Sequence, residues 1–249
     1  MDITQLAVAL RDQTAALATA LTGTDPDAPV PTCPQWRVRH LIGHADQALR
    51  WSADIARTGQ PTAVPDPLLS DPGDPATWLE SMRADADGLI TAVGEGTTPV
   101  WTFFGTLPSR FWLRRMVTDM TIHRADAAIA AGQSYEVDAA LAEEVITEGL
   151  ELLTSPATLA LRPTLVELRG TGETILLRAD SGRGWLITRK PDGPTFEDTT
   201  GDVDATVAVS GTVQDLLWLF SQRLTPDDQR VTVTGDRSQL DHWLAHTEF

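Results

Sequence analysis

The spacing of apolar residues changes from a helical period to a period of two near residue 155. Before that point, apolar side chains recur at steps of three, four or seven, which is the pattern of amphipathic helices. After it, short β-branched runs are bounded by glycine and aspartate, which is the pattern of strands. The sequence therefore predicts two domains, an all-helical one over residues 1–155 and an α+β one over residues 156–249.

Links rich in proline and glycine separate five expected helices in the first half. The five helices are expected at approximately residues 3–21, 38–52, 78–93, 110–131 and 137–150. This half is expected to be an up-and-down four-helix bundle with one additional helix.

In the second half, five short runs are expected to form a mostly antiparallel sheet, and two helices interrupt them. The strands are expected at residues 164–169, 174–179, 185–190, 205–209 and 231–234, and the helices at 213–223 and 238–246.

The charge of the chain limits its partners. Its 35 acidic residues exceed its 19 basic residues, for a net charge of −16. Such a chain repels nucleic acid and anionic membranes at long range, which disfavours a DNA-binding regulator. Because the sequence also shows no membrane-spanning run and no basic leader, we expect a soluble cytoplasmic protein.

The single cysteine, Cys33, excludes an internal disulfide and any multi-cysteine zinc cluster. A metal ion in this chain must therefore be coordinated by histidines and carboxylates. Cys33 precedes the helix expected at 38–52, where the helix dipole can lower the pKa of a thiol, but a small buried thiol is the simpler interpretation.

His242 and His246 lie one turn apart in the last expected helix and are interpreted as surface or packing residues.

Three residues in the helical half form a candidate metal site. His44 lies at the edge of the apolar face of its helix, and Asp119 and His123 lie one turn apart beside the apolar stripe of another. Two histidines and a carboxylate with open positions are typical of a catalytic metal site. Zinc suits this set, and nickel, iron and manganese are alternatives. The other explanation is structural, with His44 at the core edge and Asp119 paired with Arg115 or His123.

Four short segments carry a resemblance to a known family. They are Cys33-Pro-Gln-Trp-Arg-Val-Arg-His-Leu-Ile-Gly-His44, Trp101-Thr-Phe-Phe-Gly105, Phe111-Trp-Leu-Arg-Arg-Met116 and Thr121-Ile-His-Arg-Ala-Asp126. In order and spacing they resemble the mycothiol-dependent maleylpyruvate isomerase family, which belongs to the DinB-like bundle group. The resemblance implies a DinB-like bundle followed by a C-terminal domain of sterol-carrier-protein type.

The resemblance also implies a ligand set. The family holds a divalent metal, usually zinc, with a histidine on helix two and a glutamate and a histidine four residues apart, which correspond to His44, Asp119 and His123. This chain departs from the pattern, because Asp119 stands where glutamate is usual and Thr118 where a histidine often precedes it. Aspartate is one methylene shorter, so the helices must approach more closely or the metal must shift.

The cofactor that the resemblance implies is mycothiol, the small thiol of actinobacteria. A thiol at an open metal position becomes a thiolate that can add to a conjugated double bond. Loss of the thiol after rotation gives an isomerase, and retention of the adduct gives a transferase. Trp36, Trp101 and Trp112 are candidates to line the cofactor site, although such tryptophans are more often simply part of the core. Arg223 is the candidate cation for a substrate carboxylate, although it can also serve only the C-terminus of its helix.

The sequence thus predicts a metal-dependent enzyme that uses mycothiol to isomerise or conjugate a small electrophile resembling an enoyl acid. The competing hypothesis is a non-catalytic bundle that binds a thiol or another small ligand without metal. Either a monomer or a homodimer is compatible with the pattern.

Overall fold

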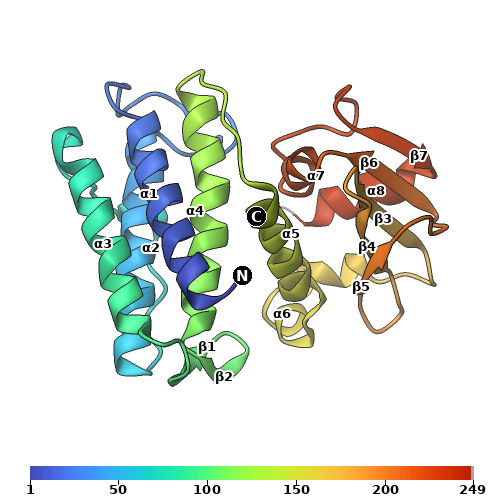
Figure 1. Ribbon diagram of the computed structural model, residues 1–249, viewed down its shortest axis with the longest axis horizontal. Helices are drawn as coiled ribbons and strands as arrows, with labels where there is room; N and C mark the ends of the chain where they lie inside the picture. The colour runs from blue at the N-terminus through green and yellow to red at the C-terminus, as the bar shows by residue number, and fades with distance from the viewer. Residues whose placement is uncertain (248–249) are drawn as a thin grey trace. The chain divides into compact units, whose positions relative to one another are not determined.

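Helices occupy the first part of the chain, and a sheet with helices occupies the second (Figure 1). The computed structural model describes residues 1–247. The chain divides into two units between Glu136 and Val137. This division confirms a helical N-terminal region followed by a sheet-containing domain.

The first unit consists mainly of four long helices. Helix α1 packs against α3 and α4, and α2 also packs against α3 and α4. Two single-turn helices, η1 and η2, lie in the link between α2 and α3, and a short hairpin precedes α4. The bounds are α1 (Ile3–Ala20), α2 (Val38–Thr58), η1 (Pro67–Leu69), η2 (Pro75–Thr77), α3 (Trp78–Val93), β1 (Pro99–Thr102), β2 (Gly105–Pro108) and α4 (Arg110–Ala130).

Local capping fixes where these helices begin and end. Asp2 and Gln5 form a reciprocal capping box at the start of α1. At the end of α2, Gly59 adopts a φ of 71°, a left-handed conformation that glycine accepts without steric cost. Helix α2 also carries His44.

The hairpin of β1 and β2 was not expected from the sequence. Thr102 pairs with Gly105, so Phe103 and Phe104 form the turn, and Gly105 follows with a φ of 94°. The strands are four residues each, too short for an alternating pattern to stand out.

The second unit is built around one five-stranded sheet in the order β5-β4-β3-β6-β7. Every pairing is antiparallel except that of β3 with β6, which confirms the prediction of a mostly antiparallel sheet. The elements are α5 (Ala139–Thr154), α6 (Pro156–Leu161), η3 (Pro163–Leu168), β3 (Thr174–Ala179), β4 (Arg183–Thr188), β5 (Thr195–Thr200), β6 (Val207–Gly211), α7 (Val213–Phe220), β7 (Thr232–Gly235) and α8 (Arg237–His246).

Helix α5 belongs to the second unit, although the sequence placed the domain boundary after residue 155. Its Thr147 hydroxyl accepts a hydrogen bond of 3.0 Å from Trp185 Nε1 of β4, and its Glu143 pairs with Arg183 at 2.8 Å. A ring carbon of Phe220 from α7 lies 2.6 Å from the position that a Cβ on Gly149 would occupy. These contacts fasten α5 to the sheet and to α7.

The strand expected at residues 164–169 was wrong, because this segment forms the 3₁₀ helix η3. Pro163 occupies its first turn, where the missing N–H costs nothing. Leu165 and Leu168 are both fully buried, and their separation of three residues matches the 3₁₀ repeat. Val166 between them is exposed, so the apolar run does not follow the two-residue alternation of a strand.

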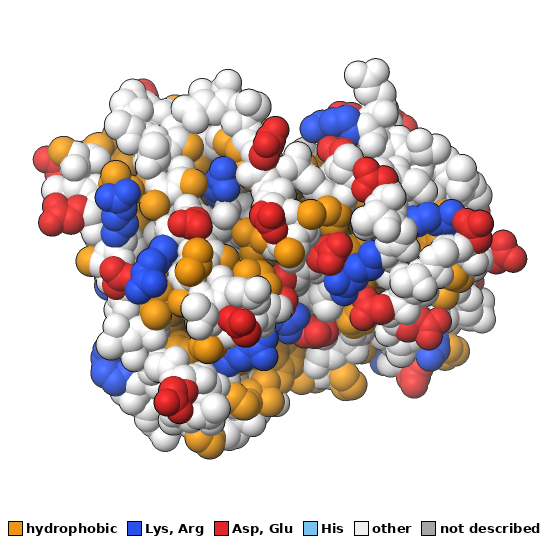
Figure 2. All heavy atoms as spheres, in the orientation of Figure 1, with side chains coloured by type: hydrophobic (Ala, Val, Ile, Leu, Met, Phe, Trp, Pro, Cys, Tyr) orange, Lys and Arg blue, Asp and Glu red, His pale blue; other side chains and the backbone are white. Residues whose placement is uncertain are grey.

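Acidic and basic side chains interleave over the visible face of both units (Figure 2). No helix in residues 1–247 combines the length and the apolar character needed to cross a membrane.

An acidic pair joins α2 to α3. Asp46 is almost fully buried, and both Asp46 and Asp85 pair with Arg50, at 2.7 and 2.9 Å. Burial and the hydrogen bond and negative charge of Asp46 raise the pKa of Asp85 to about 7, although Arg50 acts in the opposite direction. Two carboxylates so close together favour a shared proton.

This pair predicts an unusual dependence of stability on pH. The folded state keeps a proton up to about pH 7, whereas the unfolded chain releases it near pH 4, so the free energy of unfolding should fall as the pH rises between these values. Asp85→Asn should abolish this fall and stabilise the protein at pH 8. The gain should stay below the roughly 4 kcal/mol that a rise of about three pKa units represents at 1.36 kcal/mol per unit, because the ion pair between Asp85 and Arg50 is lost as well. Urea unfolding at pH 5 and pH 8 measures both effects.

The matched control is Asp87→Asn in the same helix. Asp87 pairs with Arg11 through side chains that are both more than half exposed, so its loss should change stability little at either pH. An Asp85→Asn variant that keeps the wild-type pH dependence would contradict the shared proton.

Candidate metal centre

Helices α2 and α4 bring the three predicted ligands together. His44 Nε2 lies 3.6 Å from Asp119 Oδ2, and His123 Nε2 lies 4.0 Å from Asp119 Oδ1. One potential ligand atom from each residue falls within 4.8 Å of those of the others. The three side chains are between 11% and 26% exposed, so a path from solvent remains.

These residues fit a divalent cation. Metal–nitrogen and metal–oxygen bonds of about 2.0–2.2 Å in a tetrahedral site place neighbouring ligand atoms roughly 3.3–3.6 Å apart. The histidine–carboxylate separations are 3.6 and 4.0 Å, to the two different oxygens of Asp119, and the three ligand atoms lie within 4.8 Å of one another, so a bound cation requires them to draw together by at most about 1 Å. The shorter arm of Asp119 therefore still reaches both histidines, because the rings approach to 4.9 Å between centroids.

Asp119 is held in its ionised form. Burial by itself would raise the pKa of this carboxyl. The hydrogen bond with His44 and the positive charges of His123 and Arg115 outweigh burial and hold the pKa well below its usual range. The Arg115 guanidinium lies 3.4 Å from Oδ1, so the ion pair considered as an alternative is present beside the histidine contacts. An ionised carboxylate is the form that binds a metal.

His123 has a further partner that the sequence analysis did not assign. Its Nδ1 lies 2.9 Å from Oδ2 of Asp126, whose side chain is fully buried. The spacing of three residues on one helix was the available signal, since it places both side chains on one face. The Cys33 thiol donates to the same oxygen at 3.9 Å.

Trp36 lies against both histidines. Its ring centroid is 5.0 Å from that of His44 and 5.6 Å from that of His123. A tight turn before α2 holds it there, because Val30 N–H donates to the Trp36 carbonyl at 3.1 Å and Trp36 N–H donates to the Cys33 carbonyl at 2.7 Å. Of the three tryptophans predicted to line the cofactor site, Trp36 is the one that contacts the histidines.

Trp101 and Trp112 lie in an aromatic cluster. Their rings stack at 6.2 Å, and Trp112 Nε1 donates to the Trp101 carbonyl at 2.9 Å. Trp51 of α2 meets Trp112 of α4 edge-on at 4.9 Å. Because Trp51 follows His44 by seven residues and Trp112 precedes Asp119 by seven, the cluster lies about two helical turns, roughly 10 Å, from the ligands.

Arg223 lies in the second unit, just beyond α7. Its backbone N–H donates to the Trp218 carbonyl at 2.7 Å, and its guanidinium donates to the carbonyl of Ser221. The role given to it from the sequence stays a prediction. His242 and His246 in α8 make backbone contacts of 2.7 Å, to the carbonyls of Glu167 and His242 respectively, as expected for packing residues.

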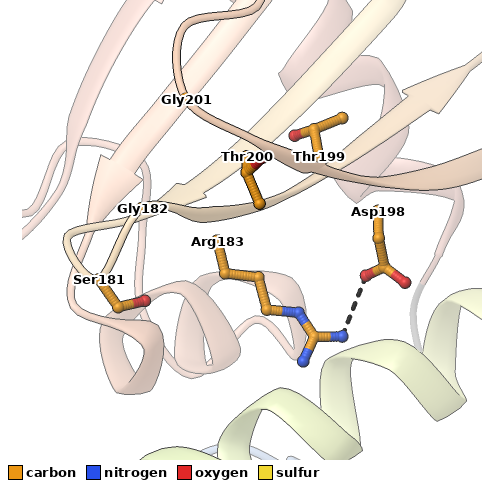
Figure 3. Close-up of a pocket in the computed structure, with 7 residues that line it drawn as sticks. All are labelled: Ser181, Gly182, Arg183, Asp198, Thr199, Thr200 and Gly201. Atoms are coloured by element: carbon orange, nitrogen blue, oxygen red, sulfur yellow. Dashed lines mark hydrogen bonds and ion pairs between the residues drawn. The ribbon is translucent and has the colours of Figure 1, made fainter.

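An open depression of about 650 Å³ lies on the second unit, between the β3–β4 turn and β5 (Figure 3). Arg183 points across it to Asp198 at 3.0 Å, and the same guanidinium pairs with Glu143 at 2.8 Å. Because two carboxylates already occupy this guanidinium, the depression offers little to an anionic substrate.

Two uncharacterised proteins of Mycobacterium tuberculosis, from the strains CDC 1551 / Oshkosh and ATCC 25618 / H37Rv, are similar to this chain. Each is 28% identical over 138 residues, which covers 54% of this chain and 70% of the relative.

Solved structures show the same fold. A crystal structure of the mycothiol-dependent maleylpyruvate isomerase matches with a TM-score of 0.59 at 18% identity, and a histidine-to-alanine mutant of that enzyme matches with a TM-score of 0.61 at 17% identity. Each match covers 94% of this chain and 93% of the other.

The model of the mycothiol maleylpyruvate isomerase N-terminal domain matches residues 7–128, a stretch that contains the whole candidate metal centre. Over residues 7–128, the chain carries the N-terminal domain of the mycothiol maleylpyruvate isomerase family.

Proposed function

We propose that the protein is a metal-dependent enzyme that uses mycothiol to isomerise or conjugate a small electrophile of the enoyl-acid type. One observation carries this proposal: His44, Asp119 and His123 converge inside the domain that identifies the family. The fold shared with the mycothiol-dependent maleylpyruvate isomerase supports it.

The three side chains are the proposed metal ligands. Zinc suits two imidazoles and one carboxylate, and nickel, iron and manganese bind similar sets. A bound divalent cation lowers the pKa of a thiol that reaches it, which makes a thiolate available at neutral pH. Asp119 supplies negative charge, Arg115 holds one of its oxygens, and Trp36 covers the histidine rings on one side.

Mycothiol bound at this centre would supply a thiolate able to add to the conjugated double bond of an enoyl acid, with the electron pair of that bond passing to the substrate carbonyl. Release of the thiolate after rotation about the resulting single bond would give the isomer. Protonation of the substrate carbon would instead leave the adduct, which is the transferase outcome.

A nearby cation would stabilise the negative charge of the substrate carboxylate and of the enolate. Arg223 is our candidate for this role, carried over from the resemblance. Trp101 and Trp112 are proposed to bind the cofactor. Trp112 lies on α4 and Trp101 on the hairpin before it, about two helical turns from the proposed ligands.

Metal analysis of the untreated protein, followed by turnover assays with mycothiol and an enoyl acid, tests the proposal. We expect bound metal near one equivalent, loss of activity after chelation, and recovery when metal is returned. A protein that carries only traces of metal, and gains no mycothiol-dependent activity when metal is supplied, would exclude the enzyme.

The competing candidate is a bundle that binds a small ligand without metal. The 3.4 Å contact between Arg115 and Asp119 favours it, since this ion pair alone can satisfy the carboxylate. Substitution of Asp119 separates the two candidates.

A further inference from the structure

The candidate metal centre contains a buried contact that lies outside the set of three proposed ligands. His123 presents one ring nitrogen to Asp119 and the other to Asp126. The second contact is the shorter of the two, at 2.9 Å. Asp126 has a fully buried side chain, whereas Asp119 keeps a fifth of its surface exposed.

A neutral histidine carries its proton on one ring nitrogen only. Free imidazole side chains prefer the proton on Nε2, which would block the nitrogen that faces Asp119 and His44. A carboxylate beside Nδ1 reverses this preference, because Nδ1–H can donate to it while Nε2 keeps its lone pair.

Asp126 is itself positioned from two sides. It lies on α4, one turn beyond His123, and the Cys33 thiol from the turn before α2 donates to the same Oδ2 at 3.9 Å. That turn also carries Trp36, which lies against the His123 ring at 5.6 Å. The ring of His123 is therefore fixed both on its face and at Nδ1.

We propose that Asp126 is a positioning residue that sets His123 in the tautomer with a free Nε2 and so prepares it to bind metal. The proposal rests on the proposed metal centre but makes a claim about the metal-free protein. Asp126 touches neither the metal nor the substrate in this scheme, so its proposed effect on the centre passes through His123.

The decisive measurement is ¹⁵N NMR of the histidine side chains in metal-free protein at pH 8. We expect His123 to carry its proton on Nδ1 in the wild type and to lose that preference in Asp126→Leu. Asp126→Asn, which preserves volume, should weaken zinc affinity by about 10- to 100-fold, the usual effect of losing such a partner. Competition against a chromophoric chelator measures this affinity.

Two control variants isolate the bond. Cys33→Ala removes the thiol contact to Asp126 Oδ2 and should leave the His123 tautomer unchanged. Asp215→Asn alters a similarly buried carboxylate in the second unit and should leave both tautomer and zinc affinity unchanged. Wild-type protein with the His123 proton on Nε2 would overturn the proposal even if the centre binds metal. Absence of metal with the expected tautomer would instead contradict the proposed function.

Discussion

Asp119→Asn is expected to abolish metal binding while the helices remain folded. The amide keeps the size of the side chain but removes the negative charge that His44 and His123 both face at 3.6–4.0 Å. Since loss of an outer partner alone costs about 10- to 100-fold in metal affinity, loss of a direct ligand should cost more than about 100-fold. Metal content after purification and zinc affinity by chelator competition measure the effect, and mycothiol-dependent activity should fall with it.

Asp119→Glu is the matched variant, because glutamate is the residue expected at this position from the family resemblance. It should retain metal, whereas Asp87→Asn, in the exposed pair with Arg11, should behave as the wild type. If Asp119→Asn keeps the wild-type metal content and only lowers stability, the Arg115 ion pair is the correct explanation and the metal centre is wrong.

Arg189→Met is expected to destabilise the second unit by about 3–4 kcal/mol, since a buried hydrogen bond from a charged group is worth roughly 1.5–3 kcal/mol and unsatisfied acceptors add to the loss. Arg189 is only 7% exposed. Its guanidinium donates to the carbonyls of Glu167, Leu168 and Arg169 at 2.8–3.3 Å and to Gln239 at 2.7 Å. Methionine fills similar volume but leaves these acceptors unpaired.

Guanidinium unfolding monitored by tryptophan fluorescence measures this loss, because Trp185 and Trp243 are both buried in the second unit. The control is Arg178→Met on the neighbouring strand, whose partner Asp202 is fully exposed, so its effect should stay within about 1 kcal/mol. Equal effects of the two substitutions would show that the carbonyl contacts of Arg189 contribute nothing specific.

The three candidate metal ligands could be grouped from the sequence because each lies on a helix whose apolar face is clear in the sequence. His44 and the pair Asp119 and His123 each lie at the edge of such a face, and the structure brings them within reach of one cation. Asp126 was missed because its partner is the far side of the His123 ring, and a helical wheel gives no ring orientation. Spacing identifies the face of a helix but not the hydrogen bonds on it.

Strand β5 could not be predicted, because it lies at the edge of the sheet. Four of its six residues are exposed, and its sequence, Thr-Phe-Glu-Asp-Thr-Thr, has one apolar side chain. Its partner β4 has a mostly buried alternation and was predicted within two residues. Alternation reports burial, so a strand with little burial leaves little pattern.

Helix α5 shows that a helical period in the sequence does not reveal which domain the helix joins. Its period was read correctly, but an apolar stripe does not state which neighbour covers it. The residues that decide its unit are polar or small: Thr147 and Glu143 bond to β4, and Gly149 admits the ring of Phe220. Such partners lie far apart in sequence, and spacing along one helix cannot reveal them.

The parallel pairing of β3 with β6 has a consequence for synthesis of the chain. Strands β3, β4 and β5 can pair as a local meander as they emerge from the ribosome. The other edge of β3 stays unpaired until β6 is synthesised, and β6 begins about thirty residues later, at Val207. During that interval, the apolar residues Ile175, Leu176 and Leu177 border an open row of backbone donors and acceptors. The nascent second unit therefore passes through a stage in which it can pair wrongly with another chain, and slow translation between β5 and β6 should lower its soluble yield.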